Sequence, residues 1–469
     1  MTLNVFSATD PDDLLNRAAD LLQSLPSGED PLRVRWVVQP GRLWERALRR
    51  KLADDGIAAG LEFGSLRLTL ERVLRLACPE VKLQGEEHLF WSLVGLLNKD
   101  PAVILPGSAP AMWLEAHAKG GELSLDRIQL ARMLAGILDD HATHRPAEVH
   151  EWLKGSDTKE DGDVAWIATL ARGLWGNPAE PRPLALQLGI LNGRLQKAGE
   201  ICGLPSRLVA VLAGAQPAVY LETLGLMARV CPVDLLVLQT CDRGRSDEIT
   251  TWKELRLRWK AAGKRQDLMQ FAEEQKWVVP GTLQAFWGKA GITLQQQLVD
   301  LEERLAGVEI EWNETEPEAA ADSASSALAI LQSDIRETRE ARRQEELIAW
   351  PAAEKSLFLL DAPSPLRELE GARECIRASL EQDKSLQPAD ILLVLADVEH
   401  HGPLLPAVFG SSSGQMESNA PDGLSRIPWH LADRSLRSDS DAVAALQDLL
   451  AALVDRITLP VVASLLAQP

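Results

Sequence analysis

The sequence predicts an α/β fold in two parts: a first domain that carries an α-helical insertion, and an incomplete second domain. Three observations predict it. In the first part, short apolar runs of strand length alternate with segments of helical period. Between two such stretches, residues 66–204 have helical period throughout. In the second part, residues 356–395 show the order apolar run, helical segment, apolar run, which is typical of a βαβ unit.

The first domain opens with the order strand, helix, strand, helix. Leu3–Ser7 alternates in polarity and meets an acidic turn, which caps a helix predicted from Pro11 to Leu25. A second strand, Val34–Val38, ends at a Gln-Pro-Gly turn and leads into a helix over Leu43–Ala53. This order indicates the start of a parallel sheet.

After the helical stretch the strand signals return. Leu208–Leu212 and Val233–Thr240 are apolar runs of strand length, with a helix predicted over Val219–Val230. We therefore expect the first sheet to resume here. The predicted first domain comprises residues 1–65 and 205–345, and residues 66–204 are the helical insertion.

A linker and a charged helix are predicted between the two domains. Trp312–Ser326 is acidic and rich in small residues, which is typical of a solvated linker. The helix predicted over Ala327–Leu347 has charges of both signs at i,i+4 spacing, as expected of an exposed face.

The second domain is predicted over residues 346–469. Strands over Leu357–Leu360 and Ile391–Leu395 flank a helix over Leu366–Leu380, and Val443–Val454 is a further apolar helix. A doubly wound sheet needs more strands than this segment supplies. We therefore expect an unfinished sheet, whose unpaired edge favours aggregation or completion by a partner.

Composition argues against several classes of protein. A formal net charge of −19 is unlike a sequence-blind nucleic-acid coat, although it allows a narrow basic channel inside an acidic exterior. The five cysteines are scattered without zinc or iron–sulfur spacing, which favours reduced thiols in a cytoplasmic protein. The first residues lack the basic and apolar regions of a signal peptide, and no run of 18 apolar residues predicts a membrane span.

The chemistry of a nucleotide-hydrolysing enzyme is missing from the sequence. A P-loop would follow the first strand, but the turn there holds Asp10, Asp12 and Asp13, whose carboxylates repel a triphosphate. No acidic cluster has the arrangement of a metal-dependent nuclease, and the adjacent His400 and His401 have no spaced acidic partner. We expect neither ATPase nor nuclease activity, and no metal or other cofactor.

Several short motifs, in order, resemble the RecC family, the gamma subunits of exodeoxyribonuclease V. They are Val38-Gln39, Gly56–Ala59 with Leu61–Phe63, Leu138–Pro146, Gly203–Arg207, Phe286–Gly291, Gln332–Ile335, Ser364–Glu370 and Ile427–Arg434. The resemblance covers essentially the whole chain. It implies two degenerate superfamily-1 helicase-like domains without ATP sites, which enclose channels for separated DNA strands. Family members are more than twice this length, so the chain is expected to be an N-terminal portion.

The resemblance also implies DNA-binding residues. Gln39, Asp139 and Arg145 match positions that contact the scanned strand in the family. Asp433-Arg434 resembles a further family segment, and we interpret it as a structural turn from which Arg434 is expected to reach the DNA backbone. Other contact positions differ in this chain, which puts recognition of the family's hotspot sequence in doubt. The differing positions are Gly41, Glu45, Glu71 and Gly136.

Structural alternatives stay open for these residues. Arg145 fits the C-terminal end of a helix, where a cation meets the helix dipole, and Gln39 fits a turn. Arg367 and Glu368 are expected to form a structural ion pair.

The function implied by the resemblance is that of a non-catalytic subunit of a bacterial helicase–nuclease. It would guide single-stranded DNA during double-strand break repair by homologous recombination, beside a RecB-like motor-nuclease and a RecD-like motor. Two alternatives remain at this point. One is a truncated remnant that acts only as a protein scaffold. The other is an active helicase–nuclease subunit of the AddB type, against which the acidic first turn argues.

Overall fold

The computed structural model describes most of the chain, with gaps. The described residues are 2–24, 33–55, 59–99, 108–117, 125–155, 165–197, 201–239, 252–263, 267–275, 289–305, 308–314, 326–336, 355–410, 427–431 and 441–454. The chain forms two compact units, Met1–Ala352 and Ala353–Pro469. The finer division into residues 1–65, 66–204, 205–345 and 346–469 stays a prediction.

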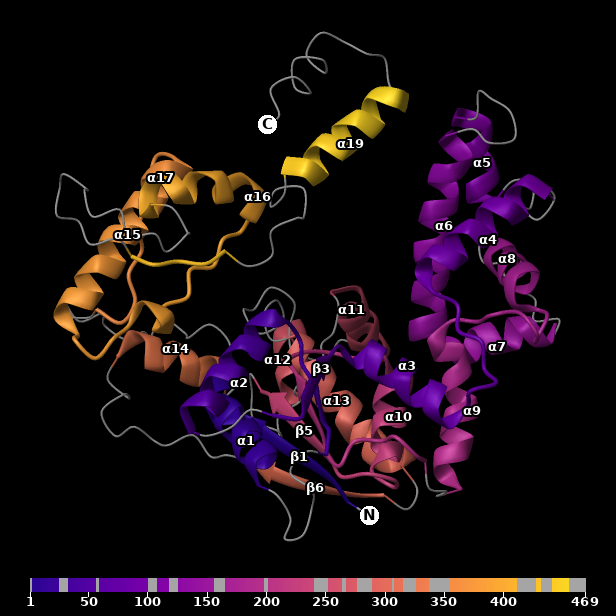
Figure 1. The fold of residues 1–469 in the computed structure, drawn as a ribbon, viewed down its shortest axis with the longest axis horizontal. Coiled ribbons are helices and arrows are strands. Elements are labelled where there is room, and N and C mark those ends of the chain that lie inside the picture. Colours follow the sequence, from indigo (N-terminus) through magenta and orange to yellow (C-terminus); the bar gives the residue numbers. More distant parts are fainter. Residues whose placement is uncertain are drawn as a thin grey trace. The chain divides into compact units, whose positions relative to one another are not determined.

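The first unit contains a parallel sheet, which confirms the predicted α/β class (Figure 1). The described strands pair in the order β3-β2-β4-β5-β1-β6, and every neighbouring pair is parallel. They are β1 (Thr2–Ala8), β2 (Arg35–Val38), β3 (Leu61–Gly64), β4 (Leu208–Leu212), β5 (Val233–Leu238) and β6 (Glu309–Glu314). Because all strands run the same way, their carboxyl ends meet at one edge of the sheet.

Helices follow most of the strands, as parallel pairing requires. Those that accompany the sheet are α1 (Pro11–Gln23), α2 (Arg42–Asp55), α10 (Ala218–Met227) and α13 (Lys289–Arg304). Between β3 and β4 come α3 (Leu66–Ala77), α4 (Glu86–Lys99), α5 (Ala109–His117), α6 (Leu125–His144), α7 (Pro146–Lys154), α8 (Ala165–Trp175) and α9 (Leu184–Gln196). The remaining helices of this unit are α11 (Trp252–Ala261), α12 (Leu268–Glu274) and α14 (Ala327–Arg336).

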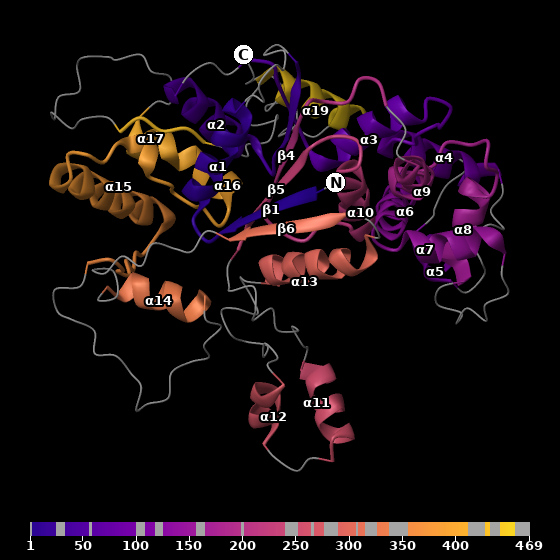
Figure 2. The same cartoon turned by 90° about the horizontal axis from the view of Figure 1, so that it is seen from below.

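Both faces of the sheet are covered. On one face Leu3 of β1 packs in a core with Leu224 of α10 and Leu298 of α13. On the other face Phe6 of β1 packs with Leu14 of α1. Figure 2 shows α13 beside β6 and β1. Burial on both faces makes strands nearly continuous apolar runs, which is why β4 and β5 were predictable from the sequence.

A buried polar network joins strands at the amino end of the sheet. Asp234 of β5 is fully buried, and its carboxylate accepts a hydrogen bond of 2.8 Å from the Asn4 amide of β1. The Arg207 Nε atom lies 3.4 Å from the other carboxylate oxygen. Arg207 Nη1 also donates to the Leu21 carbonyl at 2.9 Å, near the end of α1. One charged cluster therefore holds β1, β5, the start of β4 and α1 together.

The helices between β3 and β4 have a core of their own. It contains Leu93 of α4, Leu134 of α6 and Trp175 of α8, each almost fully buried. The Trp175 indole donates a 2.6 Å hydrogen bond to the Gln84 side chain, so its one polar atom is satisfied. Because these helices bury apolar side chains in this core, residues 66–204 show apolar positions at helical spacing.

Two edge strands were missed by the sequence analysis. β3 is only partly buried, and β6 alternates charged residues with Ile310 and Trp312, as edge strands do. The predicted linker over Trp312–Ser326 was therefore wrong for Trp312–Glu314, which belong to β6. Trp312 packs against the sheet core. Residues 315–325 lie outside the described residues.

The second unit is described mainly as helices. They are α15 (Pro365–Gln382), α16 (Val398–His401), α17 (Leu405–Phe409) and α19 (Asp441–Val454), with short 3₁₀ turns at Pro388–Asp390 and Gly402–Leu404. The helix predicted over Leu366–Leu380 is confirmed by α15, which Ser364 caps. A small core joins Leu369 of α15 to Val408 and Phe409 of α17.

The strands predicted around α15 were wrong for the described residues. Neither Leu357–Leu360 nor Ile391–Leu395 is hydrogen-bonded into a sheet. Their side chains are open to solvent, since Leu359 is 99% and Val394 79% exposed. An apolar run becomes a strand only where neighbouring backbone satisfies its N–H and C=O groups, and these runs have no such neighbour in the described part.

The described cysteines are free thiols. Cys78 and Cys231 are buried, and burial raises the pKa of the Cys231 thiol to about 12. Cys202, by contrast, is exposed. Within the described ranges, no helix is both long enough and apolar enough to cross a membrane.

Substitution of Asp234 tests the buried network. Asp234→Ala leaves the Arg207 guanidinium without its buried counter-charge, so we expect about 3 kcal/mol less unfolding free energy, measured in urea. The matched control is Asp300→Ala, which breaks an exposed pair with Arg304. That change should cost about 0.5 kcal/mol or less. Equal losses in the two variants would contradict a special role for Asp234.

Candidate nucleic-acid interface

The turn between β1 and α1 is filled by the chain's own carboxylate. Only Thr9 and Asp10 separate the strand from the helix. The Asp10 side chain is the N-cap and accepts a 2.8 Å hydrogen bond from the Asp12 backbone N–H, while Pro11 has no N–H to offer. A phosphate at this helix start would meet negative charge and fewer free donors.

Among the described residues, the end of the neighbouring strand carries no carboxylate of the kind that binds magnesium in P-loop enzymes. β5 pairs with β1, and beyond its last residue Gln239 donates its backbone N–H to the Ala8 carbonyl at 2.9 Å. P-loop enzymes use an aspartate on such a strand to bind the metal ion. Here the residue is an amide. This feature was not noticed in the sequence, although the run Leu238-Gln239 displays it.

Gln39 lies at the carboxyl end of β2. Its backbone N–H donates to the Gly64 carbonyl at 3.1 Å and so extends the pairing with β3. The side chain is half-buried, and its carbonyl oxygen has no hydrogen-bond partner among the described residues. The turn therefore uses the Gln39 backbone, while the side-chain carbonyl oxygen is buried and left without a partner among the described residues.

Asp139 is held by an arginine from another helix. The Arg67 Nη1 atom of α3 donates to the Asp139 carboxylate of α6 at 3.2 Å. The Arg67 Nε atom also donates to Glu71, one turn further along α3, at 3.4 Å. One guanidinium thus bridges two carboxylates and joins the insertion helix α6 to the helix that follows β3.

The same cluster extends to α10. Burial alone would lower the pKa of Arg67, but the charge of Asp139 and its other acidic contacts raise it above its ordinary value. Burial raises the pKa of the Tyr220 hydroxyl, against the opposing effect of Arg67. Arg67 is therefore charged and Tyr220 neutral at ordinary pH.

Arg145 stands at the corner between α6 and α7. Its backbone N–H donates to the His141 carbonyl at 2.8 Å, and it is the N-cap residue of α7. The side chain is 66% exposed, and its guanidinium lies 3.7 Å from Glu148 in the first turn of α7. Arg145 does follow the end of α6, but its observed ionic contact is with α7.

The start of α3 joins two of these positions. Gln39 is hydrogen-bonded to Gly64, and the next residue, Ser65, is the N-cap of α3. Arg67, in the first turn of α3, is hydrogen-bonded to Asp139. A short path of direct contacts thus connects the end of β2 to α6, and Arg145 follows Asp139 across the end of the same helix. Arg434 lies outside the described residues, so its predicted role stays a prediction.

Two of the positions that differ from the family pattern are glutamates, and each forms an ion pair with an arginine. Glu45 accepts from Arg49 at 3.0 Å, and Glu71 accepts from Arg67. Neither carboxylate is therefore a free negative charge beside the predicted DNA path. Gly136 is exposed on α6, and Gly41 precedes α2; both leave open space where a side chain would stand.

The predicted ion pair in the second unit has a different partner. Arg367 Nη1 contacts Glu370 at 2.6 Å, so the expected pairing with Glu368 is corrected. The two residues are three apart and share a helix face, whereas adjacent residues diverge. Among the described residues no group of three or more His, Cys, Asp or Glu side chains could hold a metal ion.

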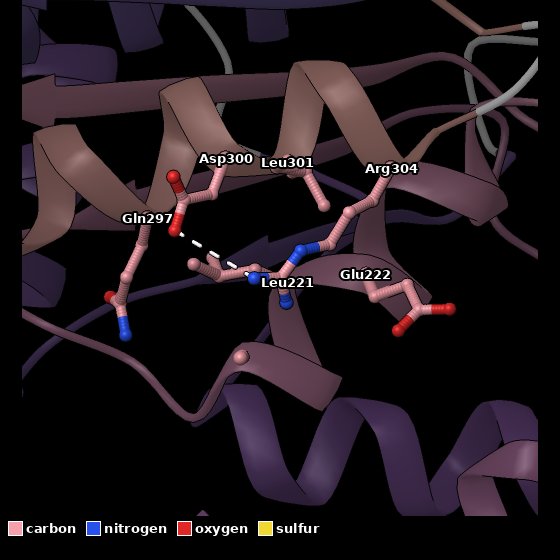
Figure 3. A pocket seen from close by; sticks show the side chains of 7 residues that line it. Leu221, Glu222, Gln297, Asp300, Leu301 and Arg304 are labelled. Atoms are coloured by element: carbon pink, nitrogen blue, oxygen red, sulfur yellow. Dashed lines mark ion pairs between the residues drawn. The ribbon is translucent and has the colours of Figure 1, made fainter.

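A shallow depression lies between α10 and α13, but it has no predicted site residue (Figure 3). Arg304 points toward Asp300 and pairs with it at 3.7 Å, so its charge is compensated. Leu221 and Leu301 supply much of the remaining lining. This combination offers no converging donors for a ligand.

Comparisons with known proteins agree with the resemblance. Residues 3–338 match the family model described as RecC, N-terminal domain. The chain is 25% identical over 450 residues to the RecBCD enzyme subunit RecC of Escherichia coli, which covers 88% of this chain. It is 26% identical over 476 residues to the RecBCD enzyme subunit RecC of Mycolicibacterium smegmatis, covering 98% of the chain.

These relatives are longer proteins. The matched region spans 38% of the Escherichia coli protein and 39% of the Mycolicibacterium smegmatis protein. The same subunit of Haemophilus influenzae, 23% identical over 483 residues, is matched over 40% of its length. The chain therefore spans about two fifths of the relatives it matches.

A double-mutant cycle tests the Arg67–Asp139 contact. Arg67→Met and Asp139→Asn should each lower the unfolding free energy, with a coupling of about 0.5–1 kcal/mol, because the pair is partly exposed. The coupling should shrink at high salt. The matched control is the exposed pair of Arg145 and Glu148, which should couple by about 0.3 kcal/mol. A coupling near zero at Arg67 would contradict the bridge.

Proposed function

We propose, from the premise that the chain belongs to the RecC family, that it serves as a non-catalytic subunit that guides single-stranded DNA. The match to the RecC N-terminal domain over residues 3–338 carries this proposal. The complex would be a RecBCD-like helicase–nuclease acting in recombinational repair of double-strand breaks. Its partners would be a RecB-like motor-nuclease and a RecD-like motor.

The β1–α1 turn supports the absence of catalysis. Asp10 takes the hydrogen bond that a phosphate would need, and its charge opposes a triphosphate. The described end of the adjacent strand, Leu238-Gln239, offers no carboxylate for a metal ion. ATP hydrolysis would therefore be supplied by the motor partners, and this chain would bind and orient DNA.

A row of exposed arginines supports a phosphate path beside Gln39. α2 begins three residues after Gln39 and carries Arg42, Arg46 and Arg50 at i, i+4 and i+8, all exposed. No carboxylate of the described residues forms an ion pair with these three. Cations at this spacing follow one helix face and contact successive phosphates, independent of sequence.

The residues of the site would have different roles in binding DNA. The arginines of α2 and Arg145 would hold the sugar–phosphate backbone. Gln39 would contact base edges as the family resemblance implies, and its buried, unpartnered carbonyl oxygen would have to turn outward to accept a hydrogen bond there. Asp139 would act mainly through its bridge to Arg67, which fixes α6 relative to α3.

Reconstitution tests the subunit role. The chain should co-purify with the RecB-like and RecD-like subunits of its own organism, and more strongly with a blunt DNA end present. Unwinding by the motor subunits should fall when the chain is omitted. Equal unwinding with and without the chain would overturn the guiding role, and binding without any effect of DNA would favour a protein scaffold.

Single substitutions separate backbone contacts from base contacts. Arg46→Gln and Arg145→Gln should each lower the salt slope of single-strand binding by about 0.7, the value expected per lost phosphate contact. Gln39→Ala should weaken binding about fivefold with the slope unchanged, because a neutral hydrogen bond is lost. Arg304→Gln is the control, since Arg304 lines the depression between α10 and α13 and is not one of the predicted DNA-binding residues, and it should change neither quantity. Identical slopes for all variants would contradict the assignment.

A further inference from the structure

A second cationic helix lies outside the site described above. α11 has the sequence WKELRLRWKA, in which four cations and one carboxylate give a net charge of +3 over ten residues. The whole chain has a formal net charge of −19, so α11, like the first part of α2, is a local exception in an acidic sequence. Within the described residues, α11 packs against α12 through buried Leu255 and Ala272.

Three of the four cations lie on the face away from this contact. Lys253, Arg256 and Lys260 are spaced at i, i+3 and i+7, and all three are exposed. At 100° per residue they lie within about 60° of one another and far from Leu255, which faces α12. No described carboxylate forms an ion pair with any of the three side chains.

In the absence of a ligand, these neighbouring positive charges lower the stability of α11. Like charges at i,i+3 and i,i+4 destabilise a helix, and Arg256 and Lys260 are such a pair. The hairpin core contains Leu255, Ala272 and the partly buried Leu268 and Phe271, and it does not need these cations. A bound polyanion would relieve the repulsion, because its phosphates supply the missing counter-charges.

An exposed tryptophan adjoins the cationic face. Trp252 is the first residue of α11 and is 42% exposed, next to Lys253. Duplex DNA hides its base faces, whereas a single strand presents them, and indole rings stack on such faces. The combination of a cationic row and an exposed indole is suited to a single strand.

We propose that the exposed face of α11 is a second binding surface for single-stranded DNA. Lys253, Arg256 and Lys260 hold the phosphates, and Trp252 stacks on a base. This inference rests on the proposed function, since it takes DNA as the ligand. It adds a contact surface on a different helix from those that carry Gln39, Asp139 and Arg145.

The test measures binding of oligo(dT) to the full chain as a function of salt. The triple variant Lys253→Gln/Arg256→Gln/Lys260→Gln should lower the log–log salt slope by about 2, at about 0.7 per phosphate contact. The matched control, Lys154→Gln/Arg304→Gln/Arg377→Gln, removes the same charge from cations that already have carboxylate partners. It should lower the slope by less than 1. Equal slopes for the two triple variants would overturn the proposal.

Trp252→Ala tests the single-strand assignment separately. It should weaken oligo(dT) binding about tenfold and leave the salt slope unchanged, while duplex binding of the same length is unaffected. Circular dichroism of each variant checks that α11 remains folded. An equal loss on duplex and single strand would overturn the assignment to single strands.

The outcomes also separate this inference from the proposed function. Normal unwinding by the reconstituted complex together with an unchanged slope in the α11 variant would overturn only the surface on α11. A wild-type chain that binds no DNA, alone or in the complex, would overturn both. If the α11 variant lost a protein partner but kept its DNA slope, the face would be a protein contact and the inference would fail.

Discussion

The fold of the first unit depends on a buried charge. Asp234 is enclosed in the sheet, and it is tolerable there only because Asn4 and Arg207 supply a hydrogen bond and a counter-charge. Arg207 is contributed by the chain just before β4, after the whole helical stretch has intervened. The network therefore closes only when β1, β4 and β5 are in their final order. Hydrophobic packing alone would allow apolar strands to exchange places, whereas this network permits a single arrangement.

Much of the candidate site was predictable, but its electrostatics were not. The motifs located Gln39, Asp139 and Arg145, and in the structure the first two each contact the segment at the start of α3. From the sequence, Glu71 was identified only as a contact position that differs from the family pattern. Its partner Arg67 also holds Asp139, which is 72 residues away in the chain. Such a bridge depends on how α6 returns to α3, and no local pattern encodes it. The arginine row on α2, by contrast, was visible in the sequence and was overlooked.

For the fold, too, some elements were predictable from the sequence and others were not. Strands buried on both faces were found because they are continuous apolar runs, as β4 and β5 are. β3 and β6 lie at the two edges of the sheet, where only part of each strand is buried, so their sequences resemble turns and linkers. The opposite error occurred at Leu357–Leu360, where an apolar run does not become a strand in the described residues. Strand formation is decided by the neighbouring backbone, which a local sequence window does not contain.

The aspartate cap on α1 has a consequence for how force passes through a helicase–nuclease. In a motor domain the equivalent turn alternates between occupied and empty as nucleotide binds and leaves, and the sheet responds to each exchange. Asp10 is covalently part of the chain, so its carboxylate never departs from the helix start. The turn would accordingly keep one state at every nucleotide concentration. Under the proposed function, the domain would act as a fixed frame against which moving subunits push a DNA strand.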